Sequence, residues 1–392
     1  MRSLLKRLCP GAEESVVRRL RADGAWRKLA NYLLVEWEAG RRSARMWGRP
    51  YWLTVDPTNF CQLKCPFCPT GAERGVRPKA SMRVEHFRHL LKEFGRELIH
   101  IDFMNWGEPL LNKDVYTMIE EAKACGVDTM LSTNLNAFDE ASARRMVRSG
   151  LDRVVLSIDG LTQETYERYR INGDYARVIE NLKTLVRVKR EEGASHPHIT
   201  WQFLVFKHNE NEIERVRETA LALGADEVGI TAANMPFKPG IREHWLPTRR
   251  EYSLYDAESF PDSPPWHWAQ AKAEKGEAPP SVDVRVYQED KREPCNWPWA
   301  GIAVNPDGSV SPCCSVEEKE YDFGNVFENS FQSVWNNEKY RRARRHVGAY
   351  AAGLKDTVPN SSHACERCFS IGKSKFVIPH QWLAKTGEVS GI

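Results

Sequence analysis

The chain has 392 residues, of which 41% are hydrophobic and 28% charged, a composition typical of a soluble globular enzyme with more than one lobe. Its formal net charge of +3 gives no electrostatic reason to expect nucleic-acid binding, and it contains no apolar run long enough to span a membrane. The basic N-terminus, MRSLLKRLCPGAEE, lacks the apolar core of a signal peptide. We therefore expect a cytoplasmic protein whose ten cysteines are reduced, so that clustered cysteines are better interpreted as metal ligands than as disulfides.

Residues 1–49 contain basic amphipathic patterns such as AWRKLANYLLVEWEAGRR. The pattern indicates helices with one apolar face. We expect these helices to pack on the main domain, although attachment to a membrane surface would need the same pattern.

Residues 50–233 alternate between strand and helix patterns six times. The predicted strands are YWLTVD (51–56), LIHIDFM (98–104), VDTMLST (127–133), DRVVLSI (152–158), HITWQFLVF (198–206) and DEVGIT (226–231). The helical patterns between them cover 82–95, 112–125, 138–149, 174–192 and 209–223. This alternation predicts an α/β domain in which helices cover a parallel sheet. Periodicity alone fits either an open doubly wound sheet or a partial barrel.

Residues 234–294 interrupt the alternation and are rich in Pro and Trp, as in MPFKPG and FPDSPPWHW. A connection of this length is usually a lid, a binding loop or a linker. A smaller α+β module is predicted in residues 295–392. It should contain a hairpin with a Pro-Asp-Gly turn at 306–308, a helix over SFQSVWNNEKYRRARRHV and a closing CERC motif.

Three cysteines, Cys61, Cys65 and Cys68, lie in the segment NFCQLKCPFC, directly after the first predicted strand. In parallel α/β folds the carboxyl ends of the strands form the catalytic edge. A structural zinc site usually needs four protein ligands, and no fourth Cys or His lies nearby. An iron–sulfur cluster prefers thiolates and can keep one iron open for a small molecule.

This segment resembles the signature of the radical S-adenosylmethionine (SAM) superfamily, C-x3-C-x2-C with an aromatic residue before the last cysteine. Cys61, Cys65, Phe67 and Cys68 match it in full. The resemblance extends over residues 50–235 and implies a partial (β/α)6 barrel. It also implies a [4Fe–4S] cluster on the three cysteines, with the open iron holding the methionyl group of SAM.

The segment NWGEP (105–109), after the second predicted strand, is similar to the GGEP-type motif of that family, with Trp106 in place of the first glycine. The resemblance implies that Gly107 and Glu108 meet the methionyl ammonium. STN (132–134) and SIDG (157–160) close the third and fourth strands, and VGITAA (228–233) matches the sixth strand that lines the adenine. The further SAM contacts that the resemblance implies are Ser132, Asn134, Ser157 and Arg170.

The family chemistry needs one electron from a reducing partner such as flavodoxin or ferredoxin. By resemblance, SAM is cleaved to a 5′-deoxyadenosyl radical, which removes hydrogen from an unactivated C–H bond. The protein then has to bind and aim the reactants and exclude water and oxygen, because the cofactor carries the difficult step.

The C-terminal cysteines resemble the shortened SPASM module often called twitch, in which four cysteines bind a second, auxiliary [4Fe–4S] cluster. Three segments match the usual sequence motifs of that module: PDGSVSPCC, FGNVFENSFQSVW and CERC. The implied ligands are Cys295, Cys313, Cys365 and Cys368, which leaves Cys314 spare. Two cysteine pairs could also build a zinc ribbon.

A cluster with four cysteine ligands has no open iron, so its natural role is electron transfer. This favours a net two-electron oxidation in which the auxiliary cluster accepts the electron of the substrate radical. If Cys314 instead returns a hydrogen atom, the enzyme is an epimerase. A peptide-modifying maturase and a non-catalytic iron–sulfur sensor are further alternatives.

A polar small molecule of the sugar or aminocyclitol type is the expected substrate, because residues 1–49 are too short for the leader-binding domain of many peptide modifiers. The cysteine spacings also look like those of the butirosin-pathway dehydrogenase. Candidate substrate contacts at the mouth of the barrel are Gln202, His208 and Asn234. An aromatic wall is expected from Trp245, Trp266, His267, Trp268, Trp297 and Trp299.

Overall fold

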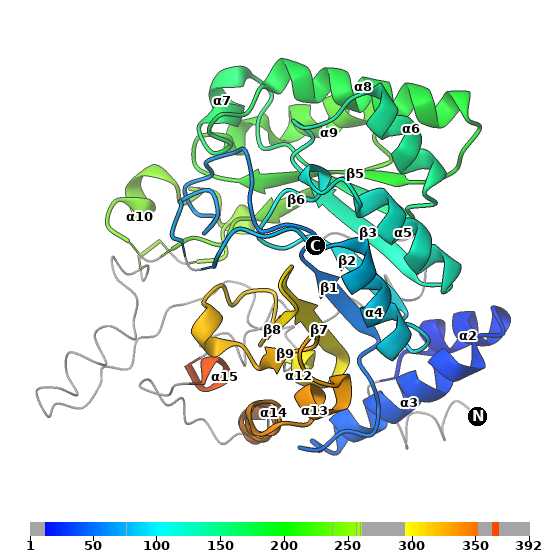
Figure 1. The fold of residues 1–392 in the computed structure, drawn as a ribbon. Coiled ribbons are helices and arrows are strands. Elements are labelled where there is room, and N and C mark those ends of the chain that lie inside the picture. The colour runs from blue at the N-terminus through cyan, green and yellow to red at the C-terminus, as the bar shows by residue number, and fades with distance from the viewer. Residues whose placement is uncertain are drawn as a thin grey trace, which may run out of the picture.

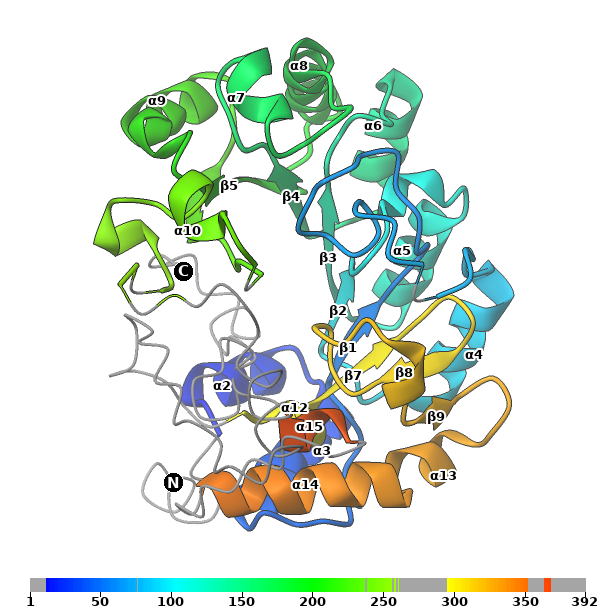
Figure 2. The same ribbon diagram turned by 90° about the vertical axis from the view of Figure 1, so that its left-hand side faces the viewer.

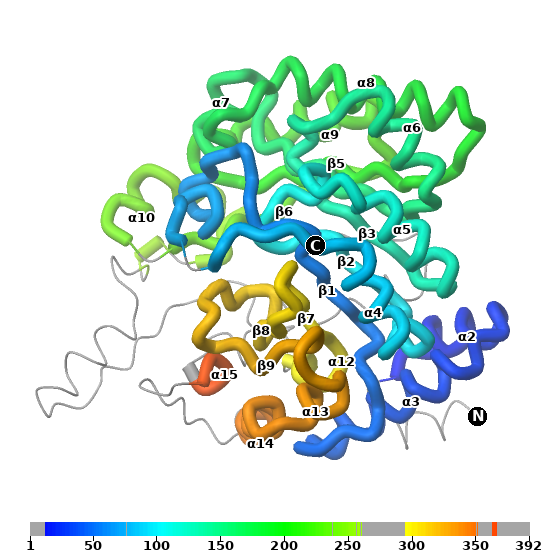
Figure 3. The backbone as a smooth tube through the Cα atoms, viewed as in Figure 1, coloured from blue at the N-terminus to red at the C-terminus, as the bar shows by residue number. Residues whose placement is uncertain are grey.

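The computed structural model describes residues 12–75, 77–236, 238–255, 257–258, 260, 295–351 and 363–367. In these residues a curved sheet carries helices around one face, and the C-terminal module lies beside the first strand (Figure 1). The tube in Figure 3 shows the same path, with the early strands at the centre of the molecule. The fold is of the α/β class, as predicted.

One nine-stranded sheet runs in the order β6-β5-β4-β3-β2-β1-β7-β8-β9. Its strands are β1 (Trp52–Val55), β2 (His100–Phe103), β3 (Asp128–Thr133), β4 (Arg153–Ser157), β5 (His198–Val205), β6 (Glu227–Ala232), β7 (Gly301–Val304), β8 (Ser309–Ser311) and β9 (Gly324–Asn325). β1 to β6 pair in parallel with their sequence neighbours. Because the order contains no reversal between β1 and β6, the doubly wound alternative is wrong and the partial-barrel arrangement holds.

The five predicted helical patterns are helices, which cover the convex face of the curved sheet (Figure 2). They are α4 (Val84–Phe94), α5 (Val115–Ala124), α6 (Glu140–Arg148), α8 (Tyr175–Glu191) and α9 (Ile213–Ala222). Right-handed crossovers between neighbouring parallel strands place all of these helices on the same face. A short helix that was not predicted, α7 (Gln163–Glu167), starts with a capping box between Thr162 and Thr165.

The convex face of the sheet is apolar, because its side chains pack under the helices. Leu53, Ile101, Leu131, Val154 and Phe203 are fully buried there. Strand residues alternate between the two faces, so the intervening residues face the concave side. That side is mainly polar, as described below.

The N-terminal helices α2 (Glu14–Ala22) and α3 (Trp26–Gly40) lie at the amino ends of the strands. Arg19 forms an ion pair with Asp128 at the start of β3, with Nη1 and Oδ2 2.5 Å apart. Lys28 Nζ donates to the carbonyl of Gly126 at 2.6 Å. These contacts attach the helices to the end of the sheet opposite the cysteine loop.

The C-terminal module continues the sheet of the barrel, since β7 pairs in parallel with β1. The predicted hairpin is present as β7 and β8, with Gly308 of its turn at a φ of 82°. The remaining elements are α12 (Trp297–Ala300), η5 (Lys319–Tyr321), α13 (Phe331–Trp335), α14 (Glu338–Ala351) and α15 (Ala364–Arg367).

The single helix predicted over residues 330–347 is wrong, because the structure has two helices separated by Asn336 and Asn337. Asn336 exchanges two side-chain hydrogen bonds with the backbone of Met46, at 2.8 and 2.9 Å. Asn337 Oδ1 accepts from Tyr340 N at 3.0 Å, near the start of α14. The local bond of Asn337 competes with helix continuation, and the bonds of Asn336 to the distant Met46 fix the chain at the break.

Within the segment predicted as a bridging insert, residues 234–294, the structure describes the short elements α10 (Ile241–His244) and η3 (Arg250–Tyr252). A further pair of one-turn elements, η1 (Pro109–Leu111) and η2 (Glu210–Glu212), follows β2 and β5. The predicted aromatic contacts Trp266, His267 and Trp268 lie outside the described residues.

Candidate active site

The three-cysteine loop leaves the carboxyl end of β1 and returns along its own base. Asn59 holds the two limbs together, with Oδ1 accepting from Ala80 N and Nδ2 donating to the Pro78 carbonyl, both at 2.7 Å. Thr58 forms an antiparallel bridge with Ser81. The loop is therefore a closed structure at the catalytic edge, and it contains Cys61, Cys65 and Cys68.

Aromatic side chains form one side of this loop. The ring of Phe67 lies 4.7 Å from Trp245, 5.6 Å from Tyr169 and 6.0 Å from Phe206, measured between centroids. These rings, with Leu63 and Cys65, belong to a second apolar cluster separate from the main core. The aromatic residue of the signature thus packs into a wall that shields the thiols from water.

The thiols themselves are suited to binding metal rather than to free reactivity. Burial raises the pKa of Cys61 to about 12, and Glu108, Cys65 and Cys68 add to the shift. Such thiols stay protonated unless a metal displaces the proton. Cys61 Sγ accepts weak hydrogen bonds from Leu63 N at 3.4 Å and Asn134 Nδ2 at 3.5 Å.

Three soft donors in one sheltered loop match the ligand set of an iron–sulfur cluster. In the parts of the chain that the structure describes, no three Cys, His, Asp or Glu side chains converge closely enough to hold one metal ion. The ligands of a four-iron cluster bind different irons and need not converge in this way. Three thiols without a fourth protein ligand in the loop match a cluster with one open iron, whereas a structural zinc site usually has four protein ligands.

The NWGEP segment lies against the base of the cysteine loop. A Cβ atom on Gly107 would be 1.5 Å from the carbonyl oxygen of Thr58, so only glycine fits at this position. Glu108 N donates to the Phe60 carbonyl at 3.0 Å. This contact brings the predicted methionyl-binding residues Gly107 and Glu108 beside the cysteine loop.

Glu108 is buried, with 2% of the residue exposed, and its carboxylate joins three segments. It accepts from Thr133 Oγ1 at 2.6 Å, Asn134 N at 2.9 Å and Leu110 N at 3.2 Å. Burial raises the pKa of Glu108, while these hydrogen bonds oppose the shift. The carboxylate thus holds the ends of β2 and β3 together at the catalytic edge.

Asp56, at the carboxyl end of β1, is a site residue that the sequence analysis missed. Its Oδ1 accepts from Gly107 N at 3.3 Å, and its buried Oδ2 has no hydrogen-bond partner among the described residues. Burial raises the pKa of Asp56 to about 7, while the amides of Gly107 and Trp106 lower it. The sequence contained one signal for this residue: Asp56 is the last residue of the first predicted strand, shortly before the three cysteines.

The other predicted SAM contacts also lie at this edge. Asn134 follows β3, and its Oδ1 accepts from Gln62 Nε2 at 2.9 Å within the cysteine loop. Arg170 pairs with the fully buried Asp159, with Nε and Oδ2 2.6 Å apart, and its Nη1 lies 4.0 Å from Cys65 Sγ. Ser132 and Ser157 lie on the concave face near the ends of β3 and β4.

Three registered rows of residues, most of them polar, line the concave face of the sheet. These rows are Thr54, Asp102, Met130, Arg153 and His198; Ser132, Val155, Thr200 and Glu227; and Ser157, Gln202 and Gly229. Asp102 accepts from Trp52 Nε1 at 2.6 Å and contacts His100 Nε2 at 2.9 Å. A polar substrate would find donors and acceptors on this face.

The remaining candidates for substrate contact are hydrogen-bonded to other residues or buried in the core. His208 Nε2 lies 3.2 Å from the Thr165 carbonyl, and burial lowers its pKa to about 4. Asn234 Oδ1 accepts a hydrogen bond from the Tyr255 hydroxyl. Trp297 and Trp299 are buried in the main core, so the structure assigns them to packing and not to an aromatic wall.

Four of the C-terminal cysteines are described: Cys295 precedes α12, Cys313 and Cys314 follow β8, and Cys365 lies in α15. α15 is attached to α14 by Arg342, whose Nη2 lies 2.7 Å from Glu366 Oε2. Cys368, the fourth predicted ligand, lies outside the described residues. Cys125, by contrast, is exposed after α5, away from both sets.

Cys314, which the resemblance leaves outside the ligand set, is half-buried after β8. Burial raises the pKa of Cys314 to about 12, and Asp102 on the concave face and Cys295 contribute to the shift. With the amide of Asn105 oriented to satisfy both neighbours, its nitrogen donates to the Cys314 carbonyl at 2.9 Å and its oxygen accepts from Trp106 Nε1 at 3.1 Å. The NWGEP segment is therefore in direct contact with the second cysteine set.

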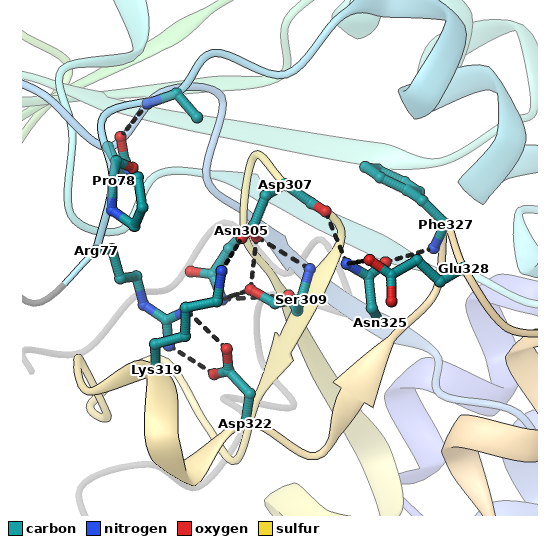
Figure 4. Close-up of polar contacts among 12 residues, drawn as sticks. Arg77, Pro78, Asn305, Asp307, Ser309, Lys319, Asp322, Asn325, Phe327 and Glu328 are labelled. Carbon is teal, nitrogen blue, oxygen red and sulfur yellow. Dashed lines mark hydrogen bonds and ion pairs between the residues drawn. The ribbon is translucent and has the colours of Figure 1, made fainter.

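Arg77, in the returning limb of the cysteine loop, makes a second connection to the module (Figure 4). Its guanidinium donates to both oxygens of Asp322 at 2.6 and 2.8 Å, to Ser309 and Ser311 at 3.2 and 3.1 Å, and to the Glu317 carbonyl at 2.8 Å. Only 6% of the Arg77 side chain and 11% of the Asp322 side chain are exposed. This buried bidentate pair fixes the cysteine loop to the C-terminal hairpin.

Comparison with known proteins agrees with this geometry. The family model described as "Radical SAM superfamily" matches residues 55–222, and the model of an iron–sulfur cluster-binding domain, SPASM, matches residues 295–369. Within the described residues, none of the helices is both long enough and apolar enough to cross a membrane.

Solved structures share the fold at low sequence identity. SuiB of Streptococcus suis bound to S-adenosylmethionine is 15% identical, with a TM-score of 0.56 over 86% of this chain and 76% of that one. Native anSMEcpe with bound AdoMet is 17% identical, with a TM-score of 0.52 over 75% and 82%. BtrN in complex with AdoMet and 2-DOIA is 13% identical over 80% and 94%, but its TM-score of 0.43 is too low to support an argument.

Proposed function

The chain belongs to the radical SAM superfamily and carries a C-terminal SPASM domain, and we propose that it oxidises a polar small molecule by two electrons. The radical SAM domain implies a [4Fe–4S] cluster and SAM, and the SPASM domain implies auxiliary iron–sulfur binding. When bound, these groups supply a 5′-deoxyadenosyl radical that takes hydrogen from the substrate and an acceptor for the electron left behind. The protein is therefore a radical SAM enzyme, and the dehydrogenase activity is our proposal.

In this proposal Cys61, Cys65 and Cys68 hold the first cluster, and the aromatic wall at Phe67 excludes water from it. Gly107 lets the backbone of NWGEP approach the loop, so that Gly107 and Glu108 can meet the methionyl ammonium. The reductant is a flavodoxin- or ferredoxin-type protein.

Three further residues are assigned to orienting SAM. Arg170, held by Asp159 and close to Cys65, is placed to meet the methionyl carboxylate. Asn134 is tied to the cysteine loop through Gln62, and Ser157 closes β4 beside the concave face. Ser132, on the same face, completes the proposed set.

The observation that carries the proposal is the contact between Asn105 and the carbonyl of Cys314. It supports a second cluster close enough to the SAM edge to accept an electron from a radical formed there. Cys295, Cys313, Cys365 and Cys368 are the proposed ligands. A substrate bound between the two cysteine sets would lose a hydrogen atom on the SAM side, an electron on the side of the auxiliary cluster, and its hydroxyl proton to a base or to water.

A small polar substrate, such as a sugar or aminocyclitol, is supported by the polar concave face. Asp102, Gln202 and Thr200 offer hydrogen-bond acceptors and donors there. Peptide modification is the main alternative, since SuiB was solved with the precursor peptide SuiA and anSMEcpe with the Cp18Cys peptide. Those chains share only the fold with this one, and so do not decide the substrate.

Epimerisation is a second candidate because Cys314 is a half-buried cysteine that the proposed ligand set leaves free. A free thiol could return a hydrogen atom to a substrate radical. Oxidation is preferred because four cysteine ligands leave the cluster no open iron, which suits it to accepting an electron. Cys313 and Cys314 are also adjacent, so on extended backbone only one of them would point at the cluster.

The test is a turnover assay in deuterated water with a panel of aminocyclitols, hexoses and peptides, comparing the parent enzyme with Cys314→Ala. Oxidation predicts a product lighter by two hydrogens, and an active Cys314→Ala enzyme. A product of unchanged mass that carries solvent deuterium at carbon, together with an inactive variant, would replace oxidation by epimerisation. Failure of the reduced protein to cleave SAM with any compound would favour a non-catalytic iron–sulfur protein.

A further inference from the structure

Arg344, in α14, is a fully buried cation without an ion-pair partner in the described part of the chain. None of its surface is exposed. Its Nε donates to the Pro298 carbonyl at 2.8 Å and its Nη1 to the Ala44 carbonyl at 3.1 Å, but its Nη2 has no hydrogen-bond partner among the described residues. A buried charge without a counterion is costly, so a negative group should lie nearby.

Within the described residues, no carboxylate pairs with this guanidinium. Glu38 is the acidic residue whose charge acts on Arg344, but both of its oxygens already accept from backbone amides, those of Trp47 at 2.7 Å and Gly48 at 2.9 Å. The guanidinium instead lies over two rings, 4.4 Å from the centroid of Trp335 and 5.0 Å from that of Tyr340. Burial lowers the pKa of Arg344 to about 10, so the group remains a cation at neutral pH.

Tyr340, one turn before Arg344 on the same helix, has a buried hydroxyl without a hydrogen-bond partner among the described residues. A buried phenol normally finds a partner, so this second unsatisfied group also indicates something missing beside it. Burial raises the pKa of Tyr340, Arg344 lowers it, and Cys365 and Cys313 raise it further. Tyr340 belongs to the main apolar core, and the half-buried Cys313 and Cys365 pack against that core.

Ring packing connects Tyr340 to the helix that carries Cys365. The Tyr340 ring lies 4.7 Å from Phe323, which in turn lies 5.1 Å from the ring of His363 at the start of α15. His363 is held to α14 through the Lys339 carbonyl at 2.8 Å. α15, which carries Cys365, is thus docked on the part of α14 that presents Tyr340.

We propose that Tyr340 and Arg344 are positioning residues of the auxiliary cluster that raise its reduction potential, Tyr340 by donating a hydrogen bond to a cluster sulfur and Arg344 by its buried positive charge. A four-iron cluster with four thiolates is an anion, and it becomes more negative on reduction. A nearby cation and a hydrogen-bond donor stabilise the reduced state more than the oxidised state. The inference rests on the proposed function, because an electron acceptor needs a potential high enough to take the electron.

The test isolates the auxiliary cluster in the full chain with Cys61→Ala, Cys65→Ala and Cys68→Ala together, reconstituted anaerobically with iron and sulfide. Tyr340→Phe removes the hydroxyl alone, and Arg344→Met removes the charge at similar volume. Tyr116→Phe is the matched control, because Tyr116 in α5 is also a largely buried tyrosine whose ring lies under an arginine, Arg145. The readouts are iron content and the midpoint potential from a titration followed by electron paramagnetic resonance.

We expect Tyr340→Phe and Arg344→Met each to shift the reduction equilibrium toward the oxidised form by about tenfold, which is about 59 mV for one electron. Tyr116→Phe should leave the potential unchanged. In deuterated buffer, a deuteron coupled to the cluster should be lost in Tyr340→Phe.

An unchanged potential and unchanged deuteron coupling in Tyr340→Phe, at full iron content, would overturn the inference while leaving the proposed function intact. The Tyr340→Phe measurements test the inference even if Arg344→Met fails to fold. If the background chain with the three alanines binds no iron at all, the second cluster and the proposed oxidation fail together.

Discussion

Gly107 sets how closely the loop after β2 can approach the cysteine loop. Its amide donates to Asp56, and the position of its missing Cβ is occupied by the Thr58 carbonyl. The sequence already predicts this glycine as part of a motif. The steric reason for it becomes visible only when the two loops are brought together.

We predict that Gly107→Ala abolishes SAM binding, because the methyl group must push the NWGEP backbone away from the cysteine loop. Iron content should fall little, since the three cysteines are unchanged. Equilibrium binding of SAM to the reconstituted protein is the measurement. Gly193→Ala is the control: its φ of 60° costs about 1 kcal/mol, but nothing lies within 4 Å of the added carbon, and SAM binding should be normal. Normal SAM binding by Gly107→Ala would show that the close approach is not required.

The buried carboxyl of Asp56 should make the stability of the folded protein depend on pH. Its folded-state pKa of about 7 is above the ordinary aspartate pKa of 3.8, so the folded protein holds this proton more tightly than the unfolded chain. The stability contributed by the protonated form is therefore fully present below about pH 4 and is lost progressively as pH rises from there to about 7, by on the order of 4 kcal/mol in total. Asp56→Asn imitates the protonated form and should not lose this stability.

The measurement is the urea midpoint of both proteins between pH 4 and pH 8. The two midpoints should be similar at the acidic end, with the asparagine variant becoming relatively more stable as pH rises. A constant difference between the two proteins across this range would mean that Asp56 does not titrate there.

At the scale of elements, the link between the cysteine loop and the β7–β8 hairpin depends on the Arg77–Asp322 pair. Arg77→Met would leave Asp322 buried without its counter-charge, which typically costs 3–5 kcal/mol. We expect a loss of about that size in unfolding free energy, and faster proteolysis of the C-terminal module. Asp322→Asn combined with Arg77→Met should recover part of the loss, since no buried charge then remains.

Lys319→Met is the matched control, at an ion pair within the same module. Lys319 Nζ lies 3.0 Å from Asp307 Oδ2, but 52% and 37% of the two side chains are exposed. Such a pair is worth about 0–1 kcal/mol. Equal effects of Arg77→Met and Lys319→Met would contradict a special role for the buried pair.

Local pattern was sufficient to predict most elements but not the contacts between distant segments. Each of the strands β1 to β6 was found within two residues of its predicted bounds. Helix α7, by contrast, is only one turn long, and the break at Asn336 depends on a partner, Met46, that lies far away in the chain. Propensity along the chain carries no information about such a partner.

The whole molecule is organised by a single sheet that continues from the barrel into the C-terminal module through β1 and β7. The cysteine signatures predicted both candidate sites, because a metal motif is local in sequence. Asp56, Asn105 and Arg77 were missed as site residues. Their roles arise from pairings across the sheet and between loops, which no local spacing reveals.

In our proposal the two cysteine sets hold two clusters with different roles. The most direct measurement is iron content together with 5′-deoxyadenosine formation in three reconstituted proteins: the parent, Cys61→Ala/Cys65→Ala/Cys68→Ala, and Cys365→Ala/Cys368→Ala. We predict about eight irons in the parent and about four in the first variant, four per cluster, with SAM cleavage lost in that variant. The second variant should still cleave SAM slowly but form no oxidised product. Four irons or bound zinc in the parent, or full product formation by the second variant, would contradict the account.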